Sequence, residues 1–139
     1  MSLPFRKHSC GSLFSGIGGF CFGFEQAGFK TLWASDIDKK VAMTYKKNFK
    51  GVEFFEQDVA TLDSSKLQPV DVLHAGFPCQ SFSAAGNRLG FEDPRGMLFE
   101  DMMDLLNALS SKPKILVLEN SSFLPFGDGG NWFDRVRSR

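Results

Sequence analysis

Short apolar runs alternate with longer segments of mixed polarity along most of the chain. This alternation is typical of strands that alternate with helices, so it predicts an α/β fold with a mostly parallel sheet. The first expected strand closes with Leu13 and Phe14, and the others occupy residues 29–35, 52–55, 70–75 and 115–118. The expected helices occupy residues 20–27, 39–49 and 96–109, and a last one begins at residues 131–136.

The first expected helix carries an ambiguous pattern. Phe20, Phe22 and Phe24 alternate with a period of two, which favours a strand. Phe20, Phe24 and Ala27 also share one helix face, and the glycines before them are typical of a helix entry. We therefore expect a helix.

Residues 70–75 are almost continuously apolar, as expected for a strand that is covered on both faces. Residues 76–95 follow, rich in Gly, Ser and Pro and without periodicity. Because loops of about 20 residues inside a domain are usually functional or disordered, this segment is a candidate functional loop.

Composition narrows the class of protein. The chain has 139 residues, one ordinary domain's worth, with 16 Lys and Arg against 16 Asp and Glu. Its 42% hydrophobic and 23% charged residues exclude a disordered or fibrous chain. No apolar run approaches the roughly 20 residues of a membrane helix, and residues 1–10 lack a secretion signal. Three cysteines without paired spacing favour free thiols and a reducing compartment, so we expect a soluble intracellular protein.

A glycine-rich turn, residues 14–19, lies between the first strand and the first helix, where it lets the backbone approach a ligand. Asp36 follows about 20 residues later, at the place where nucleotide-binding folds hold ribose hydroxyls. Asp58 comes just after the third strand. These residues outline a ligand crevice at the carboxyl edge of the sheet. The alternatives are a tight turn at the glycines, helix caps at Asp36 and Asp38, and a turn residue at Asp58.

Cys79 directly follows the fourth strand, beside this crevice, where a thiol is well placed for nucleophilic attack. The alternative, a small buried hydrophobic residue, is at least as common for a cysteine, and we expect it for Cys10 and Cys21. Glu119 ends the fifth strand, where partial burial would raise its pKa and let it hold a proton; a helix cap or ion pair is the alternative. A nucleophile and an acid on nearby strands could face one substrate.

Four segments in order, residues 14–19, 76–80, 91–96 and 119–120, closely resemble the motifs of DNA (cytosine-5) methyltransferases. The resemblance runs from Leu13 to Asn131 and implies a Rossmann-like, S-adenosylmethionine-dependent methyltransferase fold. Residues that match the cofactor site of that family are Phe14, Gly16, Gly18, Asp36, Ile37, Asp58, Val59, Pro78 and Leu98.

The same resemblance implies catalytic roles. Cys79 would attack C6 of a cytosine, and Glu119 would hold or protonate N3 and contact the exocyclic amine. Gln80 and Ser83 match a mobile loop that closes over double-stranded DNA, with ordinary loop polarity as the alternative. The target cytosine would be flipped out of the helix, as in other base-modifying enzymes. Phe14, Phe77 and Phe82 are expected at this site.

The chain also departs from the family pattern. Ser121 stands where the family usually has Val, and residues 6–11 are polar where the first strand is usually apolar. Family members continue through two more strands, a target-recognition domain and a final helix, so we expect residues 1–139 to be a partial catalytic domain, truncated after about five strands. A second polypeptide could supply the rest.

The remaining expectations concern ligand binding, the histidines, the aromatic core and the alternative functions. The isolated chain should bind S-adenosylmethionine weakly, because part of the family's cofactor pocket is missing. It should bind DNA poorly, since only Arg135, Arg137 and Arg139 cluster, as a solvated helix face. His8 and His74 are expected to be structural, with no metal site. The 16 phenylalanines predict an aromatic core with an exposed edge that favours self-association. An inactive or regulatory module, or an RNA cytosine-5 methyltransferase, remains an alternative function.

Overall fold

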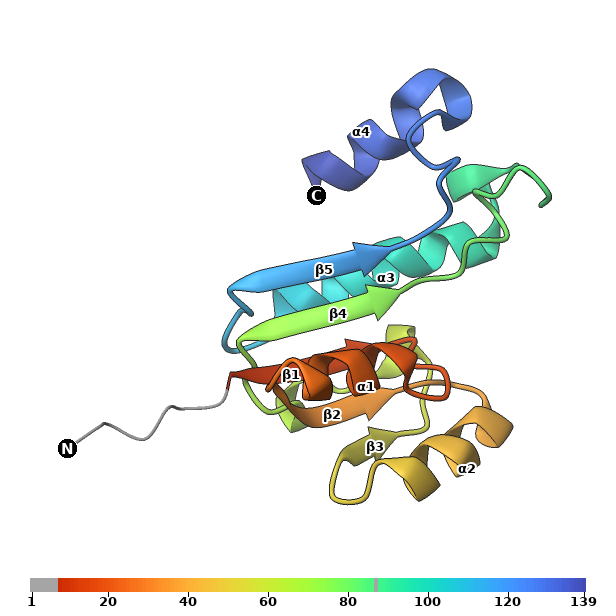
Figure 1. Ribbon diagram of the computed structural model, residues 1–139. Helices are drawn as coiled ribbons and strands as arrows, with labels where there is room; N and C mark the ends of the chain where they lie inside the picture. Colours follow the sequence, from red (N-terminus) through yellow and green to blue (C-terminus); the bar gives the residue numbers. More distant parts are fainter. Residues whose placement is uncertain (1–7, 87) are drawn as a thin grey trace.

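A computed structural model describes residues 8–86 and 88–139 of the chain. Five parallel strands form one sheet in the order β3-β2-β1-β4-β5, as Figure 1 shows. The strands are β1 (Ser9–Leu13), β2 (Lys30–Ser35), β3 (Glu53–Phe55), β4 (Val72–Gly76) and β5 (Ile115–Glu119). The predicted α/β fold with a parallel sheet of about five strands is therefore confirmed.

Four helices accompany the strands: α1 (Gly19–Gln26), α2 (Lys39–Asn48), α3 (Pro94–Ala108) and α4 (Asn131–Ser138). In Figure 1, α1 lies in front of the sheet and α3 behind it. Consecutive residues of β4 show why both faces need cover: Leu73 packs in the core shared with α3, whereas His74 packs against Phe24 of α1. The segment with the ambiguous phenylalanine pattern is thus a helix, as predicted.

Two elements begin two residues away from the predicted position. Helix α3 begins at Pro94 rather than Gly96, because Asp93 caps it and proline is well suited to the first helical position. Strand β4 begins at Val72 rather than at residue 70. The backbone N–H of Asp71, the residue before it, donates hydrogen bonds to the carbonyl and the hydroxyl of Ser9.

The polar first strand is explained by its central position. Every residue of β1 is buried, between β2 and β4. At Gly11 a Cβ atom would lie 2.5 Å from a ring carbon of Trp33, so only glycine leaves room for that indole. Trp33 is itself held by a hydrogen bond that its Nε1 donates to the Gln68 carbonyl. Small residues in β1 therefore make space for large ones on its neighbours.

Asp71 ties three strands together at their amino ends. Its Oδ2 accepts hydrogen bonds from the backbone N–H and the hydroxyl of Ser9, at 2.9 and 3.1 Å. Lys114, just before β5, places its Nζ 3.2 Å from the Asp71 Oδ1. The Ser9 backbone and the Lys114 ammonium hold the pKa of Asp71 well below its usual range. This clamp aligns β1, β4 and β5 at the edge opposite the candidate crevice.

An aromatic core fills the space between the sheet and α3, as the phenylalanine content predicts. Its buried aromatic members are Trp33, Phe77, Phe82, Phe91, Phe99 and Trp132. Phe82 was expected at the functional site; that expectation is wrong, because its ring is fully buried among other aromatic rings.

The predicted exposed apolar edge is also present. Strand β5 is the last strand of the sheet on its side, and Ile115 and Leu116 are 56% and 37% exposed. Phe126, in the turn before α4, is 74% exposed. Backbone groups along an edge strand and large apolar side chains beside it form a surface suited to further pairing.

The arginines near the end of the chain are not simply a solvated face, which corrects that expectation. Arg135 Nε lies 2.7 Å from Glu100 Oε1, and Arg139 Nε lies 2.9 Å from Glu100 Oε2. Arg135 also stacks its guanidinium 4.3 Å from the centre of the Phe91 ring. These contacts fasten α4 to α3 and to the segment before it.

His74 and two cysteines lie in a buried cluster under α1, which confirms the structural roles expected for them. The His74 ring stacks on Phe24, with 4.7 Å between ring centres. Cys21 Sγ lies 3.9 Å from His74 Nε2 and accepts a hydrogen bond from the Tyr45 hydroxyl at 3.1 Å. Burial lowers the pKa of His74 to about 4 and raises the pKa of Cys10 to about 11.

We predict that His74 makes the fold acid-sensitive. Its pKa is lower in the folded chain than the ordinary 6.5, so its contribution is fully present above that pH and is lost as the pH falls toward about 4. The free energy of unfolding should drop by about 2 kcal/mol between about pH 8 and about pH 5.

Urea unfolding at a series of pH values measures this loss. A His74→Phe variant should show a flatter pH dependence than the parent, whereas His8→Gln, at an exposed site, should keep the parent's slope. An unchanged slope in His74→Phe would contradict the assignment.

Candidate active site

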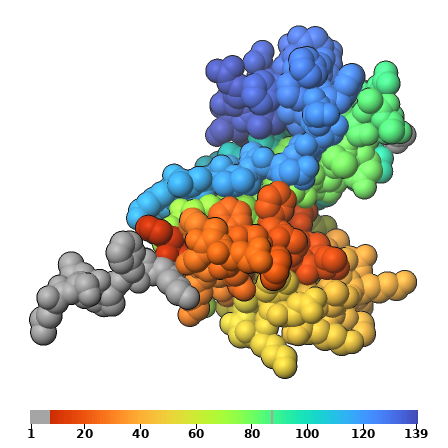
Figure 2. All heavy atoms as spheres, in the orientation of Figure 1, coloured from red at the N-terminus to blue at the C-terminus, as the bar shows by residue number. Residues whose placement is uncertain are grey.

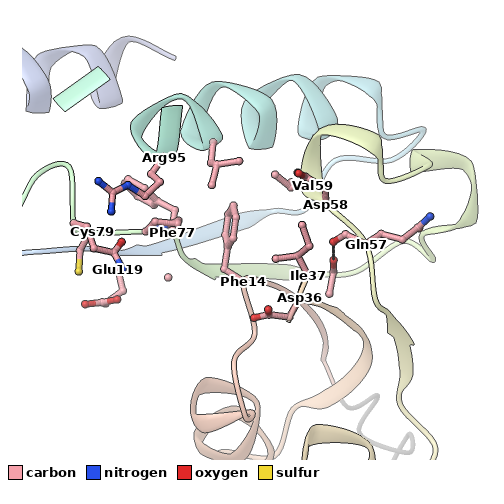
Figure 3. Close-up of a pocket in the computed structure, with 15 residues that line it drawn as sticks. Phe14, Asp36, Ile37, Gln57, Asp58, Val59, Phe77, Cys79, Arg95 and Glu119 are labelled. Carbon is pink, nitrogen blue, oxygen red and sulfur yellow. Dashed lines mark hydrogen bonds between the residues drawn. The ribbon is translucent and has the colours of Figure 1, made fainter. Parts of the chain in front are cut away.

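A pocket of about 440 Å³ opens at the carboxyl ends of the strands, a volume in the range typical of small-molecule sites. Figure 3 shows the residues that line it, which come from β2, β4, β5, α3 and the segments after the strands, Phe14 after β1 among them. They are Phe14, Ser35, Asp36, Ile37, Gln57, Asp58, Val59, Gly76, Phe77, Pro78, Cys79, Gln80, Arg95, Leu98 and Glu119.

Most sequence-predicted site residues meet in this pocket. Phe14, Asp36, Ile37, Asp58, Val59, Pro78, Leu98, Cys79, Gln80 and Glu119 all line it. Gly16, Gly18 and Ser83 do not line it. Sequence reasoning missed Gln57 and Arg95, although Gln57 directly precedes Asp58 and Arg95 lies within the recognised segment 91–96.

The glycine turn acts through Asp36. Gly16 has a φ of +56°, and its N–H donates a 2.9 Å hydrogen bond to Asp36 Oδ2. At Gly18 (φ +100°) a Cβ would lie 2.1 Å from the Phe49 ring, so both conformation and packing require glycine. The turn therefore fixes the carboxylate of Asp36 at the pocket wall.

The sequence left open whether Asp36 or Asp38 caps the second helix, and the structure assigns the cap to Asp38. Asp38 caps α2, since its Oδ1 accepts from the N–H groups of Lys40 and Val41. Asp36 does not cap the helix; its Oδ1 accepts from the Asp38 N–H at 3.0 Å. Each oxygen of Asp36 accepts one backbone hydrogen bond and keeps capacity for another, because a carboxylate oxygen has two acceptor sites.

The end of the pocket near β2 and β3 combines acid and apolar groups. Asp58 Oδ1 accepts a hydrogen bond from Ala60 at 3.0 Å and so caps a short 3₁₀ turn at Val59–Thr61, which matches the alternative of a turn residue. In Figure 3, Phe14, Ile37, Asp58 and Val59 lie around this end. Apolar walls with two carboxylates suit a flat ring that carries polar edges and hydroxyl groups.

Cys79 and Glu119 lie at the other end of the pocket, as Figure 3 shows. Strands β4 and β5 are neighbours, and Gly76 pairs in register with Glu119. A Cβ at Gly76 would lie 3.1 Å from Glu119 Oε2, so glycine leaves the carboxylate its space. The prediction that Cys79 and Glu119 lie close together at the ends of neighbouring strands is confirmed.

Two local features hold this end in place. The Asn120 side chain donates a 3.0 Å hydrogen bond from Nδ2 to the Phe77 carbonyl, which joins the end of β5 to the segment before Cys79. The Cys79 carbonyl accepts hydrogen bonds from the N–H groups of Phe82 and Ser83, at 3.0 and 2.8 Å. The thiol of Cys79 is exposed, in contrast to the buried Cys10 and Cys21.

The expected partial burial of Glu119 is wrong. Its side chain is exposed, because β5 is an edge strand and no described element covers its outer side. The long loop also has more structure than its sequence pattern predicts. Ser81 and Phe82 are buried, and Gly90–Glu92 forms a 3₁₀ turn. Ser83 points its hydroxyl at its own loop, where Oγ accepts from the Ala85 N–H.

Asp93 and Arg95 form a strong pair beside the pocket. Asp93 is buried and accepts hydrogen bonds from the Arg95 backbone N–H, Nε and Nη2 at 2.8, 3.0 and 2.8 Å. The Arg95 guanidinium and backbone hold the pKa of Asp93 well below its usual range. The pair starts α3 and fixes the guanidinium of Arg95 at the pocket wall.

Comparison with known protein families assigns the chain to one of them. A family model described as C-5 cytosine-specific DNA methylase matches residues 8–138. The chain belongs to this family. The resemblance seen in the four sequence motifs is thereby confirmed, and their residues lie around the pocket described above.

Curated relatives include type II methyltransferases from bacteria. The chain is 44% identical over 124 residues to M.Bsp6I from Bacillus sp. (strain RFL6), covering 88% of this chain and 38% of the relative. It is 42% identical over 134 residues to M.HaeII from Haemophilus aegyptius, covering 96% and 41%. The chain thus spans about two fifths of the length of these relatives.

Solved structures share the fold. A protein encoded within an E. coli prophage matches with a TM-score of 0.75 and 24% identity, over 95% of this chain and 37% of that one. The S. pombe Dnmt2 methyltransferase matches with a TM-score of 0.70 and 20% identity, over 94% and 40%. The fold is therefore the Rossmann-like methyltransferase fold that the sequence predicted.

Two absences hold for residues 8–86 and 88–139. No group of three or more His, Cys, Asp or Glu side chains is arranged to hold a metal ion there. In the same described part of the chain, no helix is long and apolar enough to cross a membrane.

We predict that Asp93→Ala destabilises the start of α3. The substitution removes the helix cap and the partner of Arg95, so the free energy of unfolding should fall by about 1–2 kcal/mol. Urea denaturation measures it. Asp63→Ala, which removes the cap of a three-residue turn at an exposed site, should change the value by less than about 0.5 kcal/mol. Equal losses in both variants would refute the special role of Asp93.

Proposed function

We propose that the chain forms one part of an enzyme that transfers a methyl group to C5 of cytosine in DNA. The exposed thiol of Cys79 and the carboxylate of Glu119 lie at the same end of one pocket, and this arrangement is the main support for the proposal. Family membership supports the same reaction. Two ends of one pocket would then hold cofactor and base side by side.

The described residues fit S-adenosylmethionine. Asp36 would bind the ribose hydroxyls with its remaining acceptor capacity, and Asp58 with Val59 would contact the adenine. Ile37, Phe14, Pro78 and Leu98 supply apolar walls, while Gly16 and Gly18 shape the turn that holds Asp36. Bound there, the cofactor supplies an electrophilic methyl group on a sulfonium sulfur.

Cys79 would add its sulfur to C6 of the cytosine, which moves the electron density of the ring's double bond to C5. A thiolate attacks much faster than a thiol, so the step needs proton loss from Cys79 or protonation of the cytosine ring. Glu119 would hold N3 and the exocyclic amine and so limit the negative charge on the ring. The methyl carbon would bond to C5 as its bond to the sulfonium sulfur breaks, and that electron pair would stay on the sulfur as a neutral thioether. The C5 proton would then pass to solvent water, its bonding electrons would re-form the C5–C6 double bond, and the Cys79 sulfur would depart as a thiolate.

A cytosine within a DNA duplex must leave the stack before these groups can reach it. Cys79 is exposed at one end of the pocket, so a flipped base is the substrate form that the site would accept. Gln80 lines the pocket, and Ser83 lies in the loop that follows, so both are proposed to meet DNA when that loop closes. Action on DNA places the enzyme inside the cell, in the cytoplasm of a prokaryote or the nucleus of a eukaryote.

A second polypeptide is part of the proposal. The chain matches about two fifths of each relative's length, and the edge strand β5, which ends at Glu119, exposes Ile115 and Leu116 near its start. A segment that covers this edge would also bury the exposed Glu119. Self-association through the same edge is the competing outcome.

Methyl transfer should depend on Cys79. The assay combines the chain with the part of M.Bsp6I beyond the matched residues, labelled S-adenosylmethionine, and either duplex DNA or RNA of mixed sequence. We expect label in DNA, and a loss of at least about a thousandfold in Cys79→Ala because the covalent route is removed. Cys10→Ala, at a buried site away from the pocket, should retain the parent's rate.

The outcomes separate the competing functions. Label in DNA that persists in Cys79→Ala overturns the mechanism. Label in RNA but not in DNA favours the RNA alternative. No label with either substrate, while S-adenosylmethionine still binds, favours a regulatory module.

A further inference from the structure

Trp132, the second residue of α4, sits in a space prepared by two glycines. Its side chain is nearly buried, with 9% of the residue exposed. A Cβ at Gly90 would lie 2.3 Å from indole atoms Nε1 and Cε2, and a Cβ at Gly127 would lie 2.0 Å from Cε3. Gly90 belongs to the loop that follows Cys79, and Gly127 belongs to the turn before α4. The indole therefore joins two segments that are far apart in the sequence.

The indole contacts the part of the loop that carries Cys79. Trp132 meets the Phe82 ring edge-on, with 5.5 Å between ring centres and an interplanar angle of 82°. Phe82 is 0% exposed, and its N–H donates the 3.0 Å hydrogen bond to the Cys79 carbonyl. One short chain of contacts thus runs from α4 through Phe82 to Cys79.

Helix α4 is a firm support for this contact. Its ion pairs from Arg135 and Arg139 to Glu100 fasten it to α3, and Arg135 covers the Phe91 ring. In Figures 1 and 2, α4 and the turn before it lie beside the loop at the same end of the molecule. The base of the loop, residues 79–83 and 90–92, is therefore held between α3, α4 and the aromatic core.

The described residues of the loop tip, 84–86 and 88–89, are held less firmly than the base. Gly90 donates its N–H to the Ser81 carbonyl at 2.9 Å, which closes the loop at its base. Between them, Ala84, Ala85, Arg88 and Leu89 are exposed. The Arg88 guanidinium donates only to the Ala84 carbonyl within the same tip, and its ring contact is with Phe123 at 5.5 Å. Base and tip thus differ in burial and in anchoring.

We propose that Trp132 is a positioning residue for Cys79. It keeps the loop base, residues 79–83 and 90–92, docked in the core, so that only the described tip, residues 84–86 and 88–89, moves when a substrate binds. The thiol then stays at the pocket during loop motion. The catalytic meaning of this device rests on the proposed function, whereas the division of the loop into base and tip does not.

Hydrogen exchange of the chain alone tests the division of the loop. We expect slow exchange at the amides of Phe82, Ser83 and Gly90, which are hydrogen-bonded in the base, and fast exchange at Ala84 and Arg88. In Trp132→Leu the base amides should exchange at least roughly tenfold faster, while the amides of β4 stay as slow as in the parent. Trp132→Phe should restore most of the protection.

Phe133→Leu is the matched control, because Phe133 is the next residue of α4 and is 40% exposed. It should leave the base amides unchanged. Unchanged protection of Phe82 and Gly90 in Trp132→Leu overturns the proposal. Equal acceleration at the base and in β4 also overturns it, because that result assigns Trp132 to general stability alone.

A kinetic arm connects the device to catalysis. In the complemented methyl-transfer assay, Trp132→Leu should lower kcat by about tenfold or more and leave KM for S-adenosylmethionine within about twofold, since the cofactor end of the pocket is untouched. Equal kcat in parent and variant would overturn the positioning role. If the parent transfers no methyl group, the proposed function fails, and the exchange result still decides whether Trp132 anchors the loop base.

Discussion

Parallel pairing of β4 with β5 is the constraint on which the candidate site depends. In a parallel pair, both strands end at the same edge of the sheet, so Gly76 and Glu119 meet in register. The chain after Gly76 then carries Cys79 to the same edge as the carboxylate of Glu119. Asp71 enforces this alignment from the opposite edge, where it joins β1, β4 and the approach to β5 through Ser9 and Lys114. A slip of one residue would send Glu119 to the other face of the sheet.

Small residues at this edge matter as much as the reactive ones. Gly76 leaves space for Glu119, Gly18 leaves space for Phe49, and Gly90 with Gly127 leaves space for Trp132. Each glycine admits a bulky or charged neighbour that would otherwise be displaced. The shape of the pocket and of the loop beside it therefore depends on glycines in one segment that make room for large side chains from another.

The sequence predicted the parts of the structure that depend on local pattern. Continuous apolar runs located the strands, and the glycine turn with Asp36 and Asp58 located the crevice. It failed where long-range packing decides. Phe82 looks like a loop residue in sequence, yet it is buried because Phe77, Phe91 and Trp132 surround it. Glu119 looked partly buried, yet β5 is an edge strand, which only the strand order reveals.

Covalent capture with a fluorinated base shows whether the Cys79 sulfur forms a bond to C6 of a cytosine, as proposed. The probe is a DNA duplex of mixed sequence that carries 5-fluorocytosine in place of cytosine, added with S-adenosylmethionine and the complementing polypeptide. Fluorine cannot leave C5 as a cation, so the adduct cannot resolve after methylation. We expect a protein–DNA complex that survives denaturation, is linked through Cys79 by peptide analysis and is absent in Cys79→Ala. Methylation of ordinary DNA without such a complex, or a crosslink to another residue, would contradict it.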